Sequence, residues 1–225
     1  MDTDEQRPTS TTKAAKPRSL LLRSAKVVCF SGEYICLVRD VSAEGTLLSF
    51  LHDTPPDARM MLVLANGLTY PIERLWEGRS QAGYRFASDV SMAEFMNDSA
   101  PYEVRPIRLA IEAPARLVDG SKTHVARLLD LSSTGAKFEC DAAVPSGRLV
   151  SFQIGGMAQF LGEVMWSADS AHTSEQGQAP AGAHGFRFSH PLPLRELAAE
   201  ALRLQPFAPR ERIGFGTALH GVNAA

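Results

Sequence analysis

The sequence repeats once at a fixed interval, and this repeat most strongly limits what the chain can fold into. Residues 40–45 and residues 130–135 both read D-x-S-x-x-G, at an offset of 90 residues. The same offset places Trp76 on Trp166, and these are the only two tryptophans in the chain. We therefore interpret the chain as two copies of one domain.

Further positions keep the register of the repeat. Arg18 falls on Arg108, and Glu73 falls on Glu163. After the tryptophans, the sequence GYRF at 83–86 corresponds to GFRF at 185–188 with an offset of 102, so the second copy carries 12 extra residues. These extra residues lie in a stretch from 167 to 184 that is rich in Ser, Ala, Gly and Gln, which is typical of a surface loop.

The bulk composition fits two small soluble domains. A length of 225 residues allows two domains of roughly 100 residues each, and 44% hydrophobic residues are enough for two cores. The net charge of -2 creates no overall attraction to nucleic acid, so we expect no nucleic-acid partner. An anionic ligand would have to be held by a local cluster of cations.

The local pattern predicts strands in both copies. Residues 149–154 and 162–166 alternate apolar and polar side chains, and turn sequences such as those at 65–67 and 118–121 separate the segments. Several short strands of this kind favour small closed barrels. A short helix is expected at 91–96. A second helix is bracketed by Pro193 and Pro206, and its apolar stripe should cover a barrel rather than fill a partner's groove: Leu194, Leu197, Ala198, Ala201 and Leu202.

The remaining residue types argue against catalysis and against a membrane span. Three cysteines without close pairing predict free thiols in a reducing compartment, and no run of about 18 apolar residues occurs, so we expect a cytoplasmic protein. The six histidines lack metal-ligand spacing, and we expect them on surfaces or loops. Glu73 and Glu163 belong to different copies, so they form no acid–base pair, whereas Trp76 and Trp166 should anchor the cores. We therefore expect neither an enzyme nor a bound cofactor.

Four sequence elements occur in the same order in both copies. They are an arginine before the first strand, the D-x-S-x-x-G element, a Glu-x-x-Trp strand and a closing Gly-aromatic-Arg-Phe strand. Together they resemble the PilZ family over about residues 13–96 and 103–203. This resemblance implies an all-β fold of two tandem six-stranded barrels, with a C-terminal amphipathic helix. It also implies a bacterial signalling protein that acts as a receptor for the second messenger cyclic di-GMP.

The chemistry of this ligand explains the residue types in the motif. Cyclic di-GMP presents two phosphates and two guanines, and the planar guanidinium of arginine can pair with either. PilZ domains that bind the messenger carry an R-x-x-x-R segment that wraps the ligand against the D-x-S-x-x-G element. The second copy has R-x-x-R instead, one residue closer. Its implied ligand-binding residues are Arg105, Arg108, Asp130, Ser132 and Gly135.

The first copy matches the arginine pattern less well. Ala14 stands where the first arginine is expected, with Lys13 and Lys16 beside it. Lysine offers a point charge and no bidentate plane, so it is a poor replacement. The weaker candidate residues of this copy are Arg18, Asp40, Ser42 and Gly45.

The repeat and its tails suggest a domain map and two functional hypotheses. We divide the chain into a polar tail (1–17), a first barrel (18–96), a linker with the arginine segment (97–108), a second barrel with its helix (109–206) and a C-terminal tail (207–225). In the first hypothesis, cyclic di-GMP orders the linker, reorients the barrels and so signals to an unidentified protein partner. In the second, Asp and Ser only cap the turn, and the tandem is a ligand-independent protein interaction module.

Overall fold

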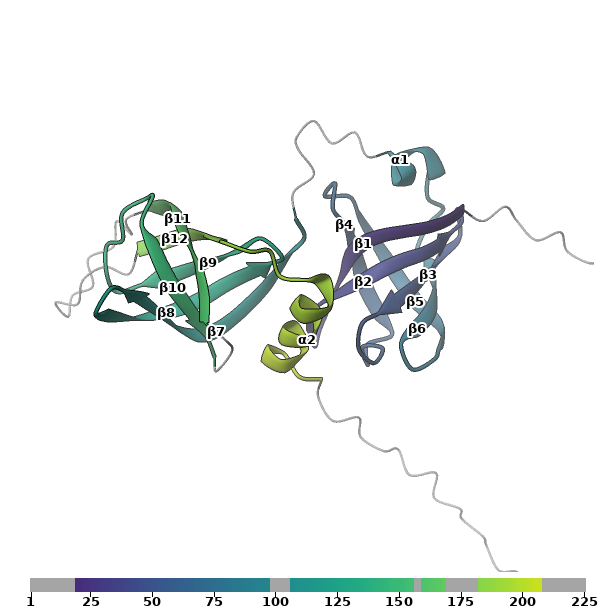
Figure 1. Ribbon diagram of the computed structural model, residues 1–225. Coiled ribbons are helices and arrows are strands. Elements are labelled where there is room, and N and C mark those ends of the chain that lie inside the picture. Colours follow the sequence, from purple (N-terminus) through teal and green to yellow (C-terminus); the bar gives the residue numbers. More distant parts are fainter. Residues whose placement is uncertain (1–18, 98–105, 156–158, 169–181, 208–225) are drawn as a thin grey trace, which may run out of the picture.

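The computed structural model describes residues 19–97, 106–155, 159–168 and 182–207, and it contains two closed β-barrels in tandem (Figure 1). The first barrel comprises β1 (Ser19–Cys29), β2 (Gly32–Val41), β3 (Gly45–Phe50), β4 (Arg59–Leu64), β5 (Thr69–Glu77) and β6 (Gln81–Phe86), followed by α1 (Met92–Met96). The second comprises β7 (Arg108–Asp119), β8 (Lys122–Ser132), β9 (Gly135–Cys140), β10 (Leu149–Ile154), β11 (Gln159–Ala168) and β12 (Gly182–Phe188), followed by α2 (Leu194–Leu204).

The two barrels share one topology. The strand order around the first barrel is β1-β2-β3-β6-β5-β4, and the second barrel repeats it as β7-β8-β9-β12-β11-β10. Neighbouring strands are antiparallel, and each barrel closes where its first strand pairs with its fourth, β1 with β4 and β7 with β10. The pairing also reproduces the sequence offset, because Leu20 lies opposite Asp40 in β2 and Ala110 lies opposite Asp130 in β8. The predicted all-β fold of two six-stranded barrels is confirmed.

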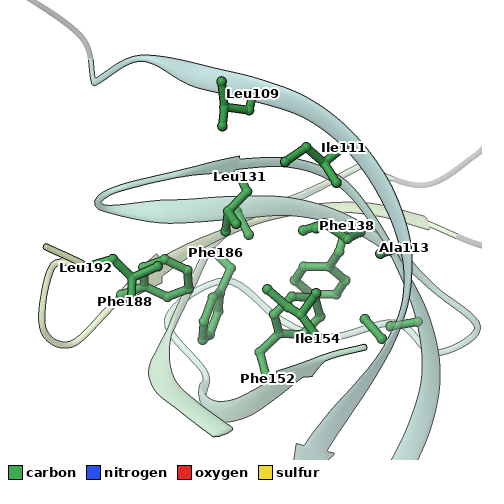
Figure 2. Packing of buried hydrophobic residues seen from close by; sticks show 14 of the residues in the cluster. Leu109, Ile111, Ala113, Leu131, Phe138, Phe152, Ile154, Phe186, Phe188 and Leu192 are labelled. Atoms are coloured by element: carbon green, nitrogen blue, oxygen red, sulfur yellow. The ribbon is translucent and has the colours of Figure 1, made fainter. Parts of the chain in front are cut away.

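Each barrel has its own apolar core, formed by the inward-facing residues of the alternating strands. Tyr34, Leu48 and Leu62 are fully buried in the first barrel. In the second, Phe138 packs against Phe152 with their ring centroids 4.8 Å apart, and the two rings lie with Phe186 at the centre of the cluster (Figure 2).

Helix α2 lies between the two barrels (Figure 1). Its buried residues Leu197, Ala198 and Ala201 pack into the core cluster of the second barrel, as the apolar stripe predicted. Leu202, which was predicted in the same stripe, packs instead against the core cluster of the first barrel, as does Phe207 beyond the end of the helix. The helix therefore covers the second barrel and also joins it to the first.

The position of both tryptophans corrects a prediction from the sequence. Trp76 is 53% exposed and Trp166 is 44% exposed, so neither is a core anchor. Each indole instead lies on the outside of its barrel over the glycine opposite in the next strand. A Cβ atom on Gly83 would lie 2.2 Å from Nε1 of Trp76, and one on Gly185 would lie 2.1 Å from Nε1 of Trp166. The glycine-tryptophan pairs therefore recur because an indole needs a bare backbone beneath it.

Two further expectations need correction in the second barrel. His184 is not a loop residue: it is fully buried in β12, its ring stacks on Phe138 at 5.0 Å, and its Nδ1 lies 2.9 Å from Oγ of Ser167. The expected surface loop from 167 to 184 is also shorter than predicted. Ser167 pairs with His184 and Ala168 with Ala183, so both ends of that stretch extend β11 and β12. The three cysteines are free thiols, as predicted.

Candidate functional site

The D-x-S-x-x-G element forms the connection between two adjacent strands in each barrel. In the second barrel, β8 ends at Ser132 and β9 begins at Gly135. The hydroxyl of Ser132 is buried and donates to the backbone carbonyl of Gly135 at 3.0 Å. Ser132 thus closes the turn, while Asp130 lies two residues earlier on β8, with its side chain partly exposed.

The glycine of the motif lies where the neighbouring strand comes close to the backbone. Neither Gly135 nor Gly45 has a positive φ, so the turn conformation alone does not require glycine there. The neighbouring strand instead approaches each of them closely. A Cβ atom would lie 2.0 Å from the carbonyl oxygen of Phe186 at Gly135, and 2.4 Å from that of Tyr84 at Gly45.

Arg108 and Asp130 meet at this end of the second barrel. Arg108 is the first residue of β7 and lies opposite Ser132 in β8. Its Nη1 donates to Oδ1 of Asp130 at 2.7 Å, and the Arg108 side chain remains 51% exposed. The structure therefore brings together Arg108, Asp130, Ser132 and Gly135, whereas Arg105 lies outside the described residues.

Two more cations lie at this surface, and neither is among the residues predicted to bind the ligand. Lys137 lies directly opposite Asp130 in the β8–β9 ladder, and Arg187 lies opposite Gly135 in the β9–β12 ladder. Arg187 Nη2 also forms an ion pair with Glu163 at 2.8 Å. The register of the repeat could have identified both residues, since Arg187 belongs to the Gly-aromatic-Arg-Phe strand and Lys137 follows the D-x-S-x-x-G element by two residues.

The first barrel holds the equivalent residues beside a groove. Asp40, Ser42 and Gly45 line a groove of about 520 Å³, together with the exposed Trp76 and with Arg85. Ser42 Oγ lies 3.3 Å from both the backbone N–H and the carbonyl of Gly45, so this turn closes as its counterpart does. Arg18 lies outside the described residues.

The glutamate of the Glu-x-x-Trp strand has the same partner in both barrels. Nε of Arg85 donates to Oε2 of Glu73 at 3.1 Å, in the same cross-strand arrangement as Arg187 and Glu163. Hydrogen bonding to the Arg85 guanidinium lowers the pKa of Glu73 below its ordinary value. Each glutamate therefore binds an arginine of its own barrel.

The charged residues near the motif differ between the two barrels. The first-barrel groove is lined by the carboxylates of Asp40, Glu44 and Asp89. Equivalent backbone hydrogen bonds show which residues correspond in the two barrels. The N–H of Phe86 donates to the carbonyl of Glu44, and the N–H of Phe188 donates to the carbonyl of Thr134.

Thr134 thus stands where the first barrel has Glu44, and by the same alignment Pro191 stands where it has Asp89. Lys137 likewise replaces Leu47, because these residues pair with Asp130 and Asp40 respectively. The second barrel therefore loses two carboxylates and gains an ammonium group at the same end, which favours an anion there and disfavours one on the first barrel.

A short polar network joins this end of the second barrel to the first barrel. Nζ of Lys26 donates to the backbone carbonyl of Arg108 at 2.8 Å and forms an ion pair with Glu33 at 2.7 Å. Oε2 of Glu33 also accepts from the backbone N–H of Ala110 at 2.8 Å. The first three residues of β7 are therefore held by β1 and β2 of the other barrel.

Within the described ranges, no group of three or more His, Cys, Asp or Glu residues could hold a metal ion. In that same part of the chain, no helix is long and apolar enough to cross a membrane.

Residues 103–203 match the family model of the PilZ domain. No curated protein matches the sequence. Among solved structures, the chain is similar to PlzA of Borreliella burgdorferi in complex with c-di-GMP, at 12% identity and a TM-score of 0.32, covering 80% of this chain and 87% of that one.

It is also similar to YcgR of Escherichia coli in complex with c-di-GMP, at 12% identity and a TM-score of 0.30, covering 82% of this chain and 81% of that one. A third similar structure is the inhibitor of motility MotI/DgrA of Bacillus subtilis, at 10% identity and a TM-score of 0.34, covering 82% and 97% of the two chains.

Proposed function

We propose that the protein is a receptor for cyclic di-GMP that binds the messenger mainly through its second barrel, which lies in the part of the chain, residues 103–203, that matches the PilZ domain family. The proposed binding residues are Arg105, Arg108, Asp130, Ser132 and Gly135. A receptor of this kind performs no reaction, and its output is a change in how it contacts a protein partner.

The observation that carries this proposal is the pairing of Arg108 with Asp130 beside the D-x-S-x-x-G turn. The carboxylate fixes one edge of a half-exposed guanidinium, with Nη1 at 2.7 Å from Oδ1. An arginine held in this way loses less conformational entropy when a ligand binds than a free one would. Its remaining N–H groups can pair with a phosphate or with a guanine edge, and its plane can stack on a base.

The surrounding charges support the same assignment. Lys137 and Arg187 lie next to Asp130 and Gly135 in the strand ladders, and they add positive potential where an anionic ligand would bind. The equivalent groove of the first barrel is lined by three carboxylates, which would repel phosphate. We therefore assign the ligand to the second barrel.

The contacts of Arg108 suggest how binding could reach the first barrel. The carbonyl of Arg108 accepts from Lys26, and Lys26 pairs with Glu33, so a shift of the start of β7 would change contacts made by β1 and β2. The proposed linker, residues 97–108, ends at the same point. A ligand that binds one placement of the barrels more tightly shifts the population toward that placement.

Replacing Lys137 with leucine tests the assignment to the second barrel. This substitution gives the second barrel the residue that the first has at position 47. We expect the affinity for cyclic di-GMP, measured by isothermal titration calorimetry on the full chain, to fall about tenfold, equal to about 1.4 kcal/mol.

The matched control for this test is Leu47→Lys in the first barrel, which should leave the affinity unchanged. If Leu47→Lys raised the affinity while Lys137→Leu had no effect, the ligand would belong to the first barrel. Absence of binding to any form of the chain would instead favour the ligand-independent interaction module.

A further inference from the structure

The groove of the first barrel has the chemistry of a site for cationic side chains. Asp40, Glu44 and Asp89 line it, and Arg85 is the only cation among the described residues that do so. The guanidinium of Arg85 is already hydrogen bonded to Glu73 at 3.1 Å. Among the described residues that line the groove, acidic residues therefore outnumber basic ones by three to one.

The exposed indole of Trp76 adds a second feature that suits a cation. Trp76 is 53% exposed, lies over Gly83 and lines the groove beside the carboxylates. The face of an indole attracts ammonium and guanidinium groups, and a nearby carboxylate strengthens the preference for positive charge. A groove of about 520 Å³ has room for one or two long side chains together with a short stretch of backbone.

The chain itself supplies a segment with matching charge. Residues 13–18 read KAAKPR, with three cations and no acidic residue. This segment runs directly into β1, and Ser19 and Leu20 at the start of β1 lie opposite Val41 and Asp40. Both of these partners line the groove, so the basic segment joins the fold at the rim of the groove.

The second barrel provides a template for the first contact. Arg108 is the residue of the second copy that corresponds to Arg18, and it binds Asp130, the counterpart of Asp40, at 2.7 Å. The first barrel adds two carboxylates that the second lacks, Glu44 and Asp89, while the first copy has lysines at 13 and 16. The extra positive and negative charges therefore occur in the same copy of the repeat.

From these observations we infer that the first-barrel groove is a docking site for the chain's own residues 13–18. The side chains of Lys13, Lys16 and Arg18 would neutralise the carboxylates that line the groove and contact the face of Trp76. The first barrel is then occupied by its own chain, which leaves the second barrel as the one open to an anionic ligand.

Zero-length carbodiimide cross-linking of the full chain tests this inference. The reagent joins a lysine amine to a carboxylate only where the two groups are in contact, and mass spectrometry identifies the pairs. We expect cross-links from Lys13 or Lys16 to Asp40, Glu44 or Asp89, and we expect them to be lost in 0.5 M salt, where surface charges are screened within about 4 Å. The pair Lys26–Glu33, at 2.7 Å, is the internal positive control.

Two variants and a mixing experiment sharpen the test. The double variant Glu44→Lys/Asp89→Lys should lose the cross-links of the basic segment and keep Lys26–Glu33. Adding Lys13→Glu/Lys16→Glu to it should restore cross-links with the charges exchanged. The inference is overturned if Lys26–Glu33 forms while residues 13–18 show no cross-link to the groove. It is also overturned if a mixture of light and isotopically heavy chains gives only mixed pairs, because the segment would then come from a second copy.

Discussion

Replacing Phe152 with alanine is expected to lower the free energy of unfolding of the second barrel by about 4 kcal/mol. Phe152 is fully buried, and its ring centroid lies 4.8 Å from that of Phe138 and 5.5 Å from that of Phe186. Removing the ring leaves a cavity among the packed side chains that Figure 2 shows, and a closed barrel has little freedom to collapse into it. Urea denaturation followed by circular dichroism measures the loss.

The matched control is Leu149→Ala on the same strand. Leu149 is 73% exposed on the outside of β10, so its truncation should change the free energy of unfolding by no more than about 0.5 kcal/mol. Equal costs for the two substitutions would mean that the alternation of β10 does not separate an inner from an outer face, and the barrel described above would be wrong.

The second large effect is expected for Gly135→Ala. This substitution should lower the free energy of unfolding by about 3 kcal/mol, which is at the upper end of the usual cost of overpacking a core. The added methyl group would lie 2.0 Å from the carbonyl oxygen of Phe186. This obstacle is backbone in the β9–β12 ladder, so it cannot rotate away as a side chain could. Thermal unfolding monitored by circular dichroism should show the variant melting well below the unchanged protein.

Gly78→Ala is the control for this prediction. A Cβ atom at Gly78 would meet its nearest neighbour, the carbonyl of Gln81, at an ordinary 3.5 Å, so the change should stay within about 1 kcal/mol. Wild-type stability in Gly135→Ala would show that the strands can separate at no cost. Loss of ligand binding in Gly135→Ala would be expected from misfolding alone, so Gly135 is a poor position at which to test recognition.

The repeat made the fold predictable because residues at equivalent places in the two copies occupy equivalent places in the strand pairing. Residues with the same offset have the same strand partners, and Asp40 and Asp130 therefore occupy equivalent positions opposite Leu20 and Ala110. The boundaries of β10 followed from its alternation in the same way. These features depend on pattern and spacing, which a sequence records directly.

Side-chain environments were harder to predict, since they depend on neighbours far away in the chain. Trp76 was expected in the core because it closes an apolar strand, but its indole packs on the outer surface over Gly83, which has no side chain to obstruct it. His184 was expected in a loop, yet β11 and β12 extend past the predicted strand ends and bury it against Phe138. A composition rich in Ser, Ala and Gly did not reveal that extension.

The motif residues of the candidate site could be predicted from the sequence, whereas the charged residues around them could not. The D-x-S-x-x-G element identified Asp130 and Ser132, and the offset identified Arg108. The position of Lys137 opposite Asp130 becomes known only from the strand pairing. The contrast between the acidic groove of the first barrel and the cationic end of the second likewise requires both sets of strand partners.

The proposed binding of cyclic di-GMP to the second barrel through Arg108 can be measured by calorimetric titration of the full chain with this ligand. Saturable binding is expected for the unchanged protein. Arg108→Ala should weaken it about 50-fold, because hydrogen bonds to charged groups contribute about 1.5–3 kcal/mol. Arg116→Ala, an exposed arginine on the same strand, should bind as the unchanged protein does. The proposal is wrong if the unchanged protein gives no saturable heat with the ligand at tens of micromolar, where a binding free energy of about 6 kcal/mol would still be detected. It is also wrong if Arg108→Ala binds the ligand as tightly as the unchanged protein.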